Sequence, residues 1–152
     1  LQFRQDAWRA VYGDLNGFTP AAFWCDAKRC SEQKPEAVAF AMLGDEIAGL
    51  IQLDLDRKVA QNAGYISFFY MRPGFRDHGF GVQMLGHGVS VCRSLGRAAL
   101  QLSVSPQNQK AMRFYDRYGF EPIGKTAGFH GDLVLMEKKI DRTPFLLPSQ
   151  QN

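Results

Sequence analysis

No stretch of this sequence is apolar for long enough to cross a bilayer, since a membrane-spanning helix needs about 20 such residues. There is no block of Lys or Arg, and the formal net charge is only +3, so we expect neither a nucleic acid nor a membrane as a partner. The chain begins Leu1-Gln2-Phe3-Arg4, without an initiator Met or a signal-peptide pattern. We therefore expect a domain cut from a longer protein; a homodimer and attachment to another domain both stay open.

Cysteine is scarce, with three residues in all, and an odd number argues against a framework of paired disulfides. Cys25 and Cys30 lack the spacing of a zinc finger, and no ligand-like partner accompanies His78, His87 or His130. We expect no metal, and reduced thiols of the kind found in a cytoplasmic protein.

A length of 152 residues, 45% of them hydrophobic, is typical of one globular domain. We expect that domain to span residues 1–140. Residues 141–152 contain Pro144, Pro148 and polar side chains, and a loose C-terminal tail is expected there.

The apolar pattern predicts two short helices followed by a meander of three strands. The expected helices are Gln5–Tyr12 and Pro20–Arg29, and the expected strands are Ala37–Leu43, Ile47–Leu55 and Gly64–Met71. After Pro73-Gly74 the pattern changes to alternating helix and strand. It predicts a helix at Gly79–Leu95, a strand at Ala98–Val104, a helix from Ser105 to Gly119, and strands at Glu121–Gly124 and Leu133–Lys138. A right-handed crossover should then place Gly64–Met71 parallel to Ala98–Val104.

The segment Arg76–Gly81 joins a strand to a helix and favours binding of a diphosphate. A helix N-terminus offers unpaired N–H groups and a partial positive charge. Gly79 and Gly81 would let a ligand approach the backbone, and the Arg76 guanidinium suits phosphate geometry. The alternative is a glycine-tolerant turn before a core helix, with Arg76 merely solvated. The spacing alone does not choose between them.

Two sequence signatures resemble those of the GNAT superfamily of acetyltransferases. The first is R-x-x-G-x-G/A, and its matching residues are Arg76, Gly79 and Gly81. The second is N-x-x-A-x-x-x-Y-x-x-x-G-F, and its matching residues are Asn108, Ala111, Tyr115, Gly119 and Phe120. The two occur in the family's order, and the resemblance covers Ala37–Lys138. One departure is Asp77, where the family commonly has glycine.

The resemblance implies a single α/β domain with a mixed, mostly antiparallel, twisted sheet and helices on both faces. A central parallel pair of strands would splay into a V-shaped cleft. The family's first strand is expected to be missing from this chain, because a helix comes first. The resemblance also implies acetyl-CoA as co-substrate, held by Phe69, Tyr70, Met71, Arg76, Asp77, His78, Gly79, Phe80, Gly81, Asn108, Ala111 and Phe114.

For Tyr115 the resemblance implies the role of general acid, which protonates the departing thiolate when an amine attacks the thioester. A phenol of ordinary pKa is protonated at neutral pH and is able to donate. The alternative is packing, because Tyr115 shares a helical face with Phe114 and Tyr118. Asn108 is open between helix cap and cofactor contact, and Ser105 is the competing cap.

The implied activity is transfer of an acetyl group from acetyl-CoA to a primary amine on a small molecule or peptide. The acceptor would be contacted by the loops Tyr12–Phe18 and Lys125–Asp132. By residue type alone, Glu46, Asp54 and Asp132 are candidates for the general base. A non-catalytic module that senses acyl-CoA is the alternative from another functional class.

A third motif points elsewhere. Gly119–Thr126 matches the P-loop pattern G-x-x-x-x-G-K-S/T letter for letter. A working P-loop joins a strand to a helix, whereas this segment follows a helix and leads into a glycine-rich stretch that is poorly suited to start one. We keep a nucleotide-binding protein as the distant alternative, which a helix beginning at Lys125 would favour.

Overall fold

The computed structural model of the chain describes Gln5, residues 20–129 and residues 131–141. Apart from Gln5, the helix expected at Gln5–Tyr12 lies outside the described residues, as do the loop Tyr12–Phe18, His130 and the tail from residue 142. In the described part, no helix has the length and apolar character needed to span a bilayer.

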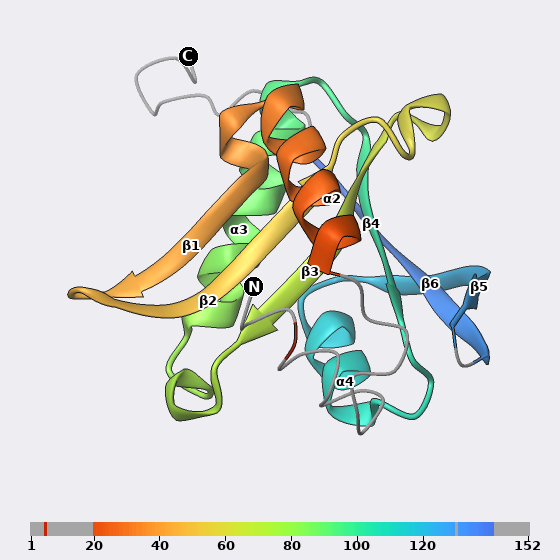
Figure 1. The fold of residues 1–152 in the computed structure, drawn as a ribbon. Helices are drawn as coiled ribbons and strands as arrows, with labels where there is room; N and C mark the ends of the chain where they lie inside the picture. Colours follow the sequence, from red (N-terminus) through yellow and green to blue (C-terminus); the bar gives the residue numbers. More distant parts are fainter. Residues whose placement is uncertain (1–4, 6–19, 130, 142–152) are drawn as a thin grey trace, which may run out of the picture.

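A six-stranded sheet forms the centre of the molecule, and its strand order is β1-β2-β3-β4-β6-β5 (Figure 1). The strands are β1 (Val38–Leu43), β2 (Glu46–Asp54), β3 (Ala63–Met71), β4 (Ala99–Val104), β5 (Glu121–Gly128) and β6 (Gly131–Lys139). The helices are α2 (Pro20–Gln33), α3 (Phe80–Ser94) and α4 (Gln109–Arg117). This mixed α/β architecture is the expected one, with β3 and β4 as its parallel pair.

Three elements run farther than the sequence indicated. Helix α2 continues past Arg29 to Gln33, and β5 and β6 extend until their ends meet at the Gly128–Gly131 pair. The segment Lys125–Asp132, expected as an acceptor loop, is therefore mostly paired strand. Its glycines disfavour a strand locally. The segment forms a strand nevertheless, because the hydrogen-bonded ladder between β5 and β6 stabilises it.

The parallel pair is short, because β3 and β4 part before either strand ends. Their ladder runs from the Ala63–Ala99 pair to the Ile66–Leu102 pair, while β3 continues to Met71. The register between β2 and β3 shifts at the same place, which leaves Ser67 as an extra residue in β3. Such a bulge bends its strand and increases the local twist. The bulge at Ser67 thus coincides with the start of the expected V-shaped split.

The two faces of the sheet differ in chemistry. Helix α3 covers one face, where a Cβ built on Gly88 would lie 3.3–3.5 Å from side-chain carbons of Ile51, Leu53 and Leu100. Glycine leaves the helix room to pack closely here, and this packing buries the apolar side of β2 and β4 in the main core. Successive side chains of a strand point to opposite faces, so the neighbours of these residues, such as Gln52, point away from α3.

Helix α2 lies on that second face and is fastened by an ion-pair network. The Arg29 guanidinium donates to Asp26 at 2.6 Å and to Asp54 at 2.8 Å. Gln52 also donates to Asp26, and Gln33 donates to the second oxygen of Asp54. These contacts join α2 to the end of β2.

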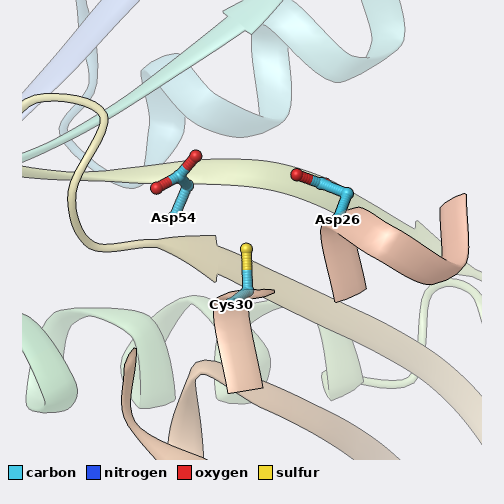
Figure 2. Close-up of side chains that lie close together, drawn as sticks. All are labelled: Asp26, Cys30 and Asp54. Atoms are coloured by element: carbon cyan, nitrogen blue, oxygen red, sulfur yellow. The ribbon is translucent and has the colours of Figure 1, made fainter. Parts of the chain in front are cut away.

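Asp26, Cys30 and Asp54 lie close together, with ligand-type atoms within 4.8 Å of one another (Figure 2). Both carboxylates already accept hydrogen bonds from Arg29. Burial raises the pKa of the Cys30 thiol to about 11, so the thiol stays neutral at pH 7. A group whose acceptors are already engaged and whose sulfur is protonated is a poor metal site.

The same network lowers the pKa of Asp54. Burial alone would raise it, but hydrogen bonds from Arg29, Gln33 and the N–H of Asp56 outweigh burial and bring the pKa to about 2. Because the folded value lies below the unfolded value of 3.8, this group contributes stability above pH 4. That contribution is lost as the pH falls toward 2.

We expect Asp54→Asn to lower the free energy of unfolding at pH 7 by about 1–3 kcal/mol, because Arg29 loses its charged partner. The variant should also lose less stability than the parent between pH 4 and pH 2. Urea unfolding followed by circular dichroism across this range measures both effects. Asp45→Asn in the exposed β1–β2 turn is the control. If Asp54→Asn lost as much free energy of unfolding as the parent between pH 4 and pH 2, the low pKa assigned to Asp54 would be contradicted.

Candidate active site

The junction between β3 and α3 leaves main-chain donors without acceptors. Helix α3 begins at Phe80, its N-cap is Gly79, and no side chain in the described chain caps it. The first turn of a helix has N–H groups that no intrahelical carbonyl reaches. Within residues 20–129 and 131–141, no acceptor is found for the N–H groups of Phe80, Gly81 and Val82. This arrangement is a ready site for an anion.

Two residues of the junction have left-handed backbone. Gly79 has φ +82°, and a Cβ built on it would meet no atom within 4 Å. Asp77 has φ 64°, a conformation that costs an L-residue energy and that glycine adopts freely. The glycine common at this position in the GNAT signature thus has a conformational explanation.

Gly81 has a different role from the one expected. A Cβ at this position would lie 3.0 Å from Cζ of Phe114 on α4, which is tighter than an ordinary contact. Glycine here lets the first turn of α3 pack against α4. The sequence suggested that this glycine makes room for a ligand, and the structure shows that it makes room for a side chain of the protein itself.

Arg76 is tied to the end of β3. Its Nε donates to the carbonyl oxygen of Met71 at 2.9 Å, and its guanidinium lies 5.7 Å from the centre of the Tyr70 ring. The Arg76 side chain is exposed, and no hydrogen bond to a described residue engages its terminal nitrogens. The Nε atom of Arg76 therefore ties the loop to the end of β3, and the two terminal nitrogens of the guanidinium face solvent.

Main-chain groups at the end of β3 face the split. The N–H of Arg72 donates to Ala48 on β2 at 2.8 Å. Groups on successive residues of a paired strand point to alternate sides, so those of Met71 and Phe69 point away from β2. The bond from Arg76 to the Met71 carbonyl agrees with this direction.

Tyr115 lies in an aromatic cluster beside the split. Its ring centre is 6.0 Å from that of Phe69 on β3, 5.4 Å from that of Phe114 and 5.6 Å from that of Phe120. Burial raises the pKa of the Tyr115 phenol above its ordinary value, so the hydroxyl is protonated at neutral pH. No described residue forms a hydrogen bond with that hydroxyl. Packing and a proton-donating role are compatible at this position.

Asn108 is the N-cap of α4. Its side-chain oxygen accepts a hydrogen bond from the N–H of Ala111 at 3.2 Å. The rival cap, Ser105, instead accepts from the N–H of Gln107. The capping interpretation of Asn108 is therefore confirmed.

Comparison with known proteins places this geometry in a family. The model of the acetyltransferase (GNAT) family matches residues 2–120. This chain belongs to the GNAT acetyltransferase family. It is 26% identical over 120 residues to N-alpha-acetyltransferase 50 of Danio rerio, and the alignment covers 75% of this chain and 71% of the relative.

Solved structures share the fold of this acetyltransferase. The crystal structure of Ard1 from Thermoplasma volcanium aligns with a TM-score of 0.71 and 20% identity, covering 91% of this chain and 88% of that one. An acetyltransferase structure from Bacillus anthracis, determined in complex with acetyl coenzyme A, aligns with a TM-score of 0.62 and 19% identity. That alignment covers 68% of this chain and 62% of the other.

The P-loop alternative is contradicted, as the position of the motif after a helix indicated. Lys125 and Thr126 lie inside strand β5, paired with Val134 and Leu133, so no helix N-terminus follows the motif. The letters match, but a P-loop needs helical amides directed at phosphate. Among the other motif-like residues, His87 is structural, since its Nε2 lies 2.8 Å from the carbonyl oxygen of Glu36.

The structure does not gather the expected general bases around Tyr115. Asp54 is held by Arg29, and a carboxylate whose pKa is about 2 is a poor proton acceptor at neutral pH. Glu46 begins β2 at the β1–β2 turn, and Asp132 lies near the β5–β6 turn. No contact in the described chain joins either residue to Tyr115.

The sequence reasoning missed a row of polar groups on the face opposite α3. The Tyr65 hydroxyl donates to Oγ of Ser103 at 2.8 Å, and Thr126 donates to the same oxygen at 3.1 Å. These three hydroxyls come from β3, β4 and β5 and lie where β3 and β4 part. For Ser103, alternation with the apolar neighbours Leu102 and Val104 was the available signal, but only strand pairing brings the three hydroxyls together.

The backbone at Asp77 yields a ranked prediction for stability in this acetyltransferase. Asp77→Gly should raise the free energy of unfolding by up to about 1 kcal/mol, because glycine adopts φ 64° without strain. Asp77→Asn should be neutral, since asparagine also tolerates this region, and Asp77→Ala should be destabilising. Chemical denaturation of the three variants measures the order, and Ala ranking above Gly would contradict the left-handed assignment.

Proposed function

We propose that the protein transfers an acetyl group from acetyl-CoA to a primary amine by direct attack. The observation that carries this proposal is the uncapped start of α3 beside the parted strands β3 and β4, in a chain of the GNAT family. A diphosphate needs several N–H donors at one place, and this junction offers them.

Binding is assigned to the junction and to the strand end. The N–H groups of Gly79, Phe80 and Gly81 would hold the pyrophosphate, and the outer nitrogens of Arg76 would add positive charge. The main-chain groups of Phe69 and Met71 would contact the pantetheine arm. The same proposal includes the rest of the binding set from the sequence. Tyr70 belongs to β3, Asp77 and His78 belong to the junction, and Asn108, Ala111 and Phe114 belong to α4 and its N-cap.

The chemistry follows from these placements. The amine nitrogen bonds to the thioester carbon, and the developing oxyanion is stabilised by the N–H of Met71. The carbon–sulfur bond breaks, and the thiolate takes the proton of Tyr115. The ammonium gives up one proton to solvent before attack, and the nitrogen gives up a second to solvent as the amide forms. The phenol regains a proton from solvent. No covalent acyl-enzyme is needed.

The acceptor is proposed only as a primary amine on a small molecule or peptide. Similar proteins include an N-alpha-acetyltransferase of Danio rerio, by sequence, and a nourseothricin acetyltransferase, by structure. No observation favours the alternative of a non-catalytic acyl-CoA sensor. The test below separates the two.

Tyr115→Phe removes only the proton donor. The ring contacts with Phe69, Phe114 and Phe120 survive, so stability and CoA affinity should change little. We expect kcat for amine-dependent thiol release from acetyl-CoA to fall about 10²–10⁴-fold, with the Kd for CoA within twofold. Tyr118→Phe on the same helix is the matched control. Unchanged turnover in Tyr115→Phe would refute the acid assignment.

The pH dependence provides a second measurement on the same residue. Because burial raises the pKa of Tyr115, the donor form persists as the pH rises, and the phenol should cause no loss of kcat up to pH 10. Activity should instead rise from acid to neutral pH as the acceptor amine loses its proton. An alkaline limb below pH 9 that vanishes in Tyr115→Phe would contradict this.

A further inference from the structure

Gln101 is a buried amide in the middle of the sheet that is only half satisfied. It lies between Tyr65 on β3 and Glu137 on β6, and its side chain is 3% exposed. Its Nε2 donates to Glu137 Oε2 at 2.7 Å. Its Oε1 is buried without a hydrogen-bond partner in the described part of the chain.

An apolar side chain would suit this position better for stability alone. Leu100 and Leu102, the neighbours of Gln101 on β4, pack in the main core, and an unpaired buried carbonyl weakens the fold. Among the described residues, the side-chain hydrogen bond of Gln101 is made to a carboxylate, which it orients. A buried polar group kept at the expense of stability points to a use for the group that it holds.

Glu137 is a carboxylate that forms no ion pair with a described residue. It is half-buried on β6, and its cross-strand neighbours are Gln101 on one side and Glu121 on the other. No Lys or Arg among residues 20–129 and 131–141 pairs with either glutamate. Like charges on opposite residues of paired strands repel each other, so a cation bound at Glu137 would relieve this repulsion.

The position of Glu137 relates it to the split. Tyr65, Gln101 and Glu137 form one row across three strands, directly before the pair Ile66–Leu102 at which β3 and β4 part. Their side chains lie on the face opposite α3, where the Tyr65 hydroxyl bonds Ser103. The Arg57 guanidinium lies 4.2 Å from the centre of the Tyr65 ring, so the row has a cation at its β3 end and the Glu137 carboxylate at its β6 end.

We propose that Glu137, oriented by Gln101, binds the ammonium group of the acceptor, so that the protein selects cationic primary amines over neutral nucleophiles. This proposal rests on the proposed function, whose acceptor site it specifies. The carboxylate supplies charge and an acceptor atom, an ammonium supplies the matching N–H donors, and Gln101 is a positioning residue.

The direct test is binding of n-butylammonium chloride, with 1-butanol as the neutral molecule of similar shape. Backbone amide shifts of the ¹⁵N-labelled protein are followed by NMR at pH 7 in the presence of CoA. We expect butylammonium, and not butanol, to shift the amides around Gln101 and Glu137. Glu137→Gln should raise the butylammonium concentration at half-saturation at least tenfold, because the substitution removes the charge and keeps the shape of the side chain.

Glu121→Gln is the matched control, since it removes the same charge from the adjacent strand. For this variant, the butylammonium concentration at half-saturation should stay within about twofold of the value for the parent. Equal losses in the two variants would indicate an unspecific acidic surface and overturn the proposal. Equal shifts with butanol, or no shift near Glu137, would also overturn it.

Turnover distinguishes this proposal from the proposed function. For any amine that supports thiol release from acetyl-CoA, Glu137→Gln should raise the KM for that amine at least tenfold and leave the Kd for CoA unchanged. Gln101→Met should raise KM about fivefold without a fall in the unfolding midpoint; an unchanged KM would refute its positioning role. If no amine supports thiol release but butylammonium still binds at Glu137, the proposed function fails and the ammonium site stands.

Discussion

The parting of β3 from β4 is the constraint on which the site depends. Parallel strands that stay paired use their main-chain groups on one another. Here the ladder stops after Ile66 and Leu102, at the bulge around Ser67, and the strand end beyond it keeps N–H and C=O groups directed at the gap. The same parting admits α4, whose aromatic side chains pack against Phe69. One extra residue in one strand thus lies where the strands part and where α4 brings Tyr115 beside Phe69.

The two faces of the sheet are different chemical environments. The face under α3 is apolar and closely packed, and Gly88 lets the helix approach it. The opposite face contains two buried glutamines, Gln52 and Gln101, and each donates to a carboxylate and leaves its own oxygen without a described partner. Each such oxygen lowers stability by about 1–3 kcal/mol. The protein therefore concentrates its packing on one face and its unsatisfied polar groups on the other.

Much of this protein could be predicted from the sequence because the signals were local. Alternation and helical periodicity depend on neighbouring residues, and they located the strand–helix–strand unit and the parallel pair. Arg76 and Gly79 stand at a junction whose chemistry is set by a helix end, and Tyr115 falls on a helical face. Asn108 could be identified as a cap for the same reason. The composition alone left the acceptor open.

What only the tertiary structure decided involves partners distant in the chain. Gly81 is needed because Phe114 from α4 meets it, and Asp54 is unsuitable as a base because Arg29 from α2 holds it. The P-loop letters at Lys125 lie in a strand because β6 pairs with them. Glu137 became a candidate only when pairing set it beside Gln101. Local propensity determines which element a segment forms, whereas register and burial depend on contacts that the linear sequence does not specify.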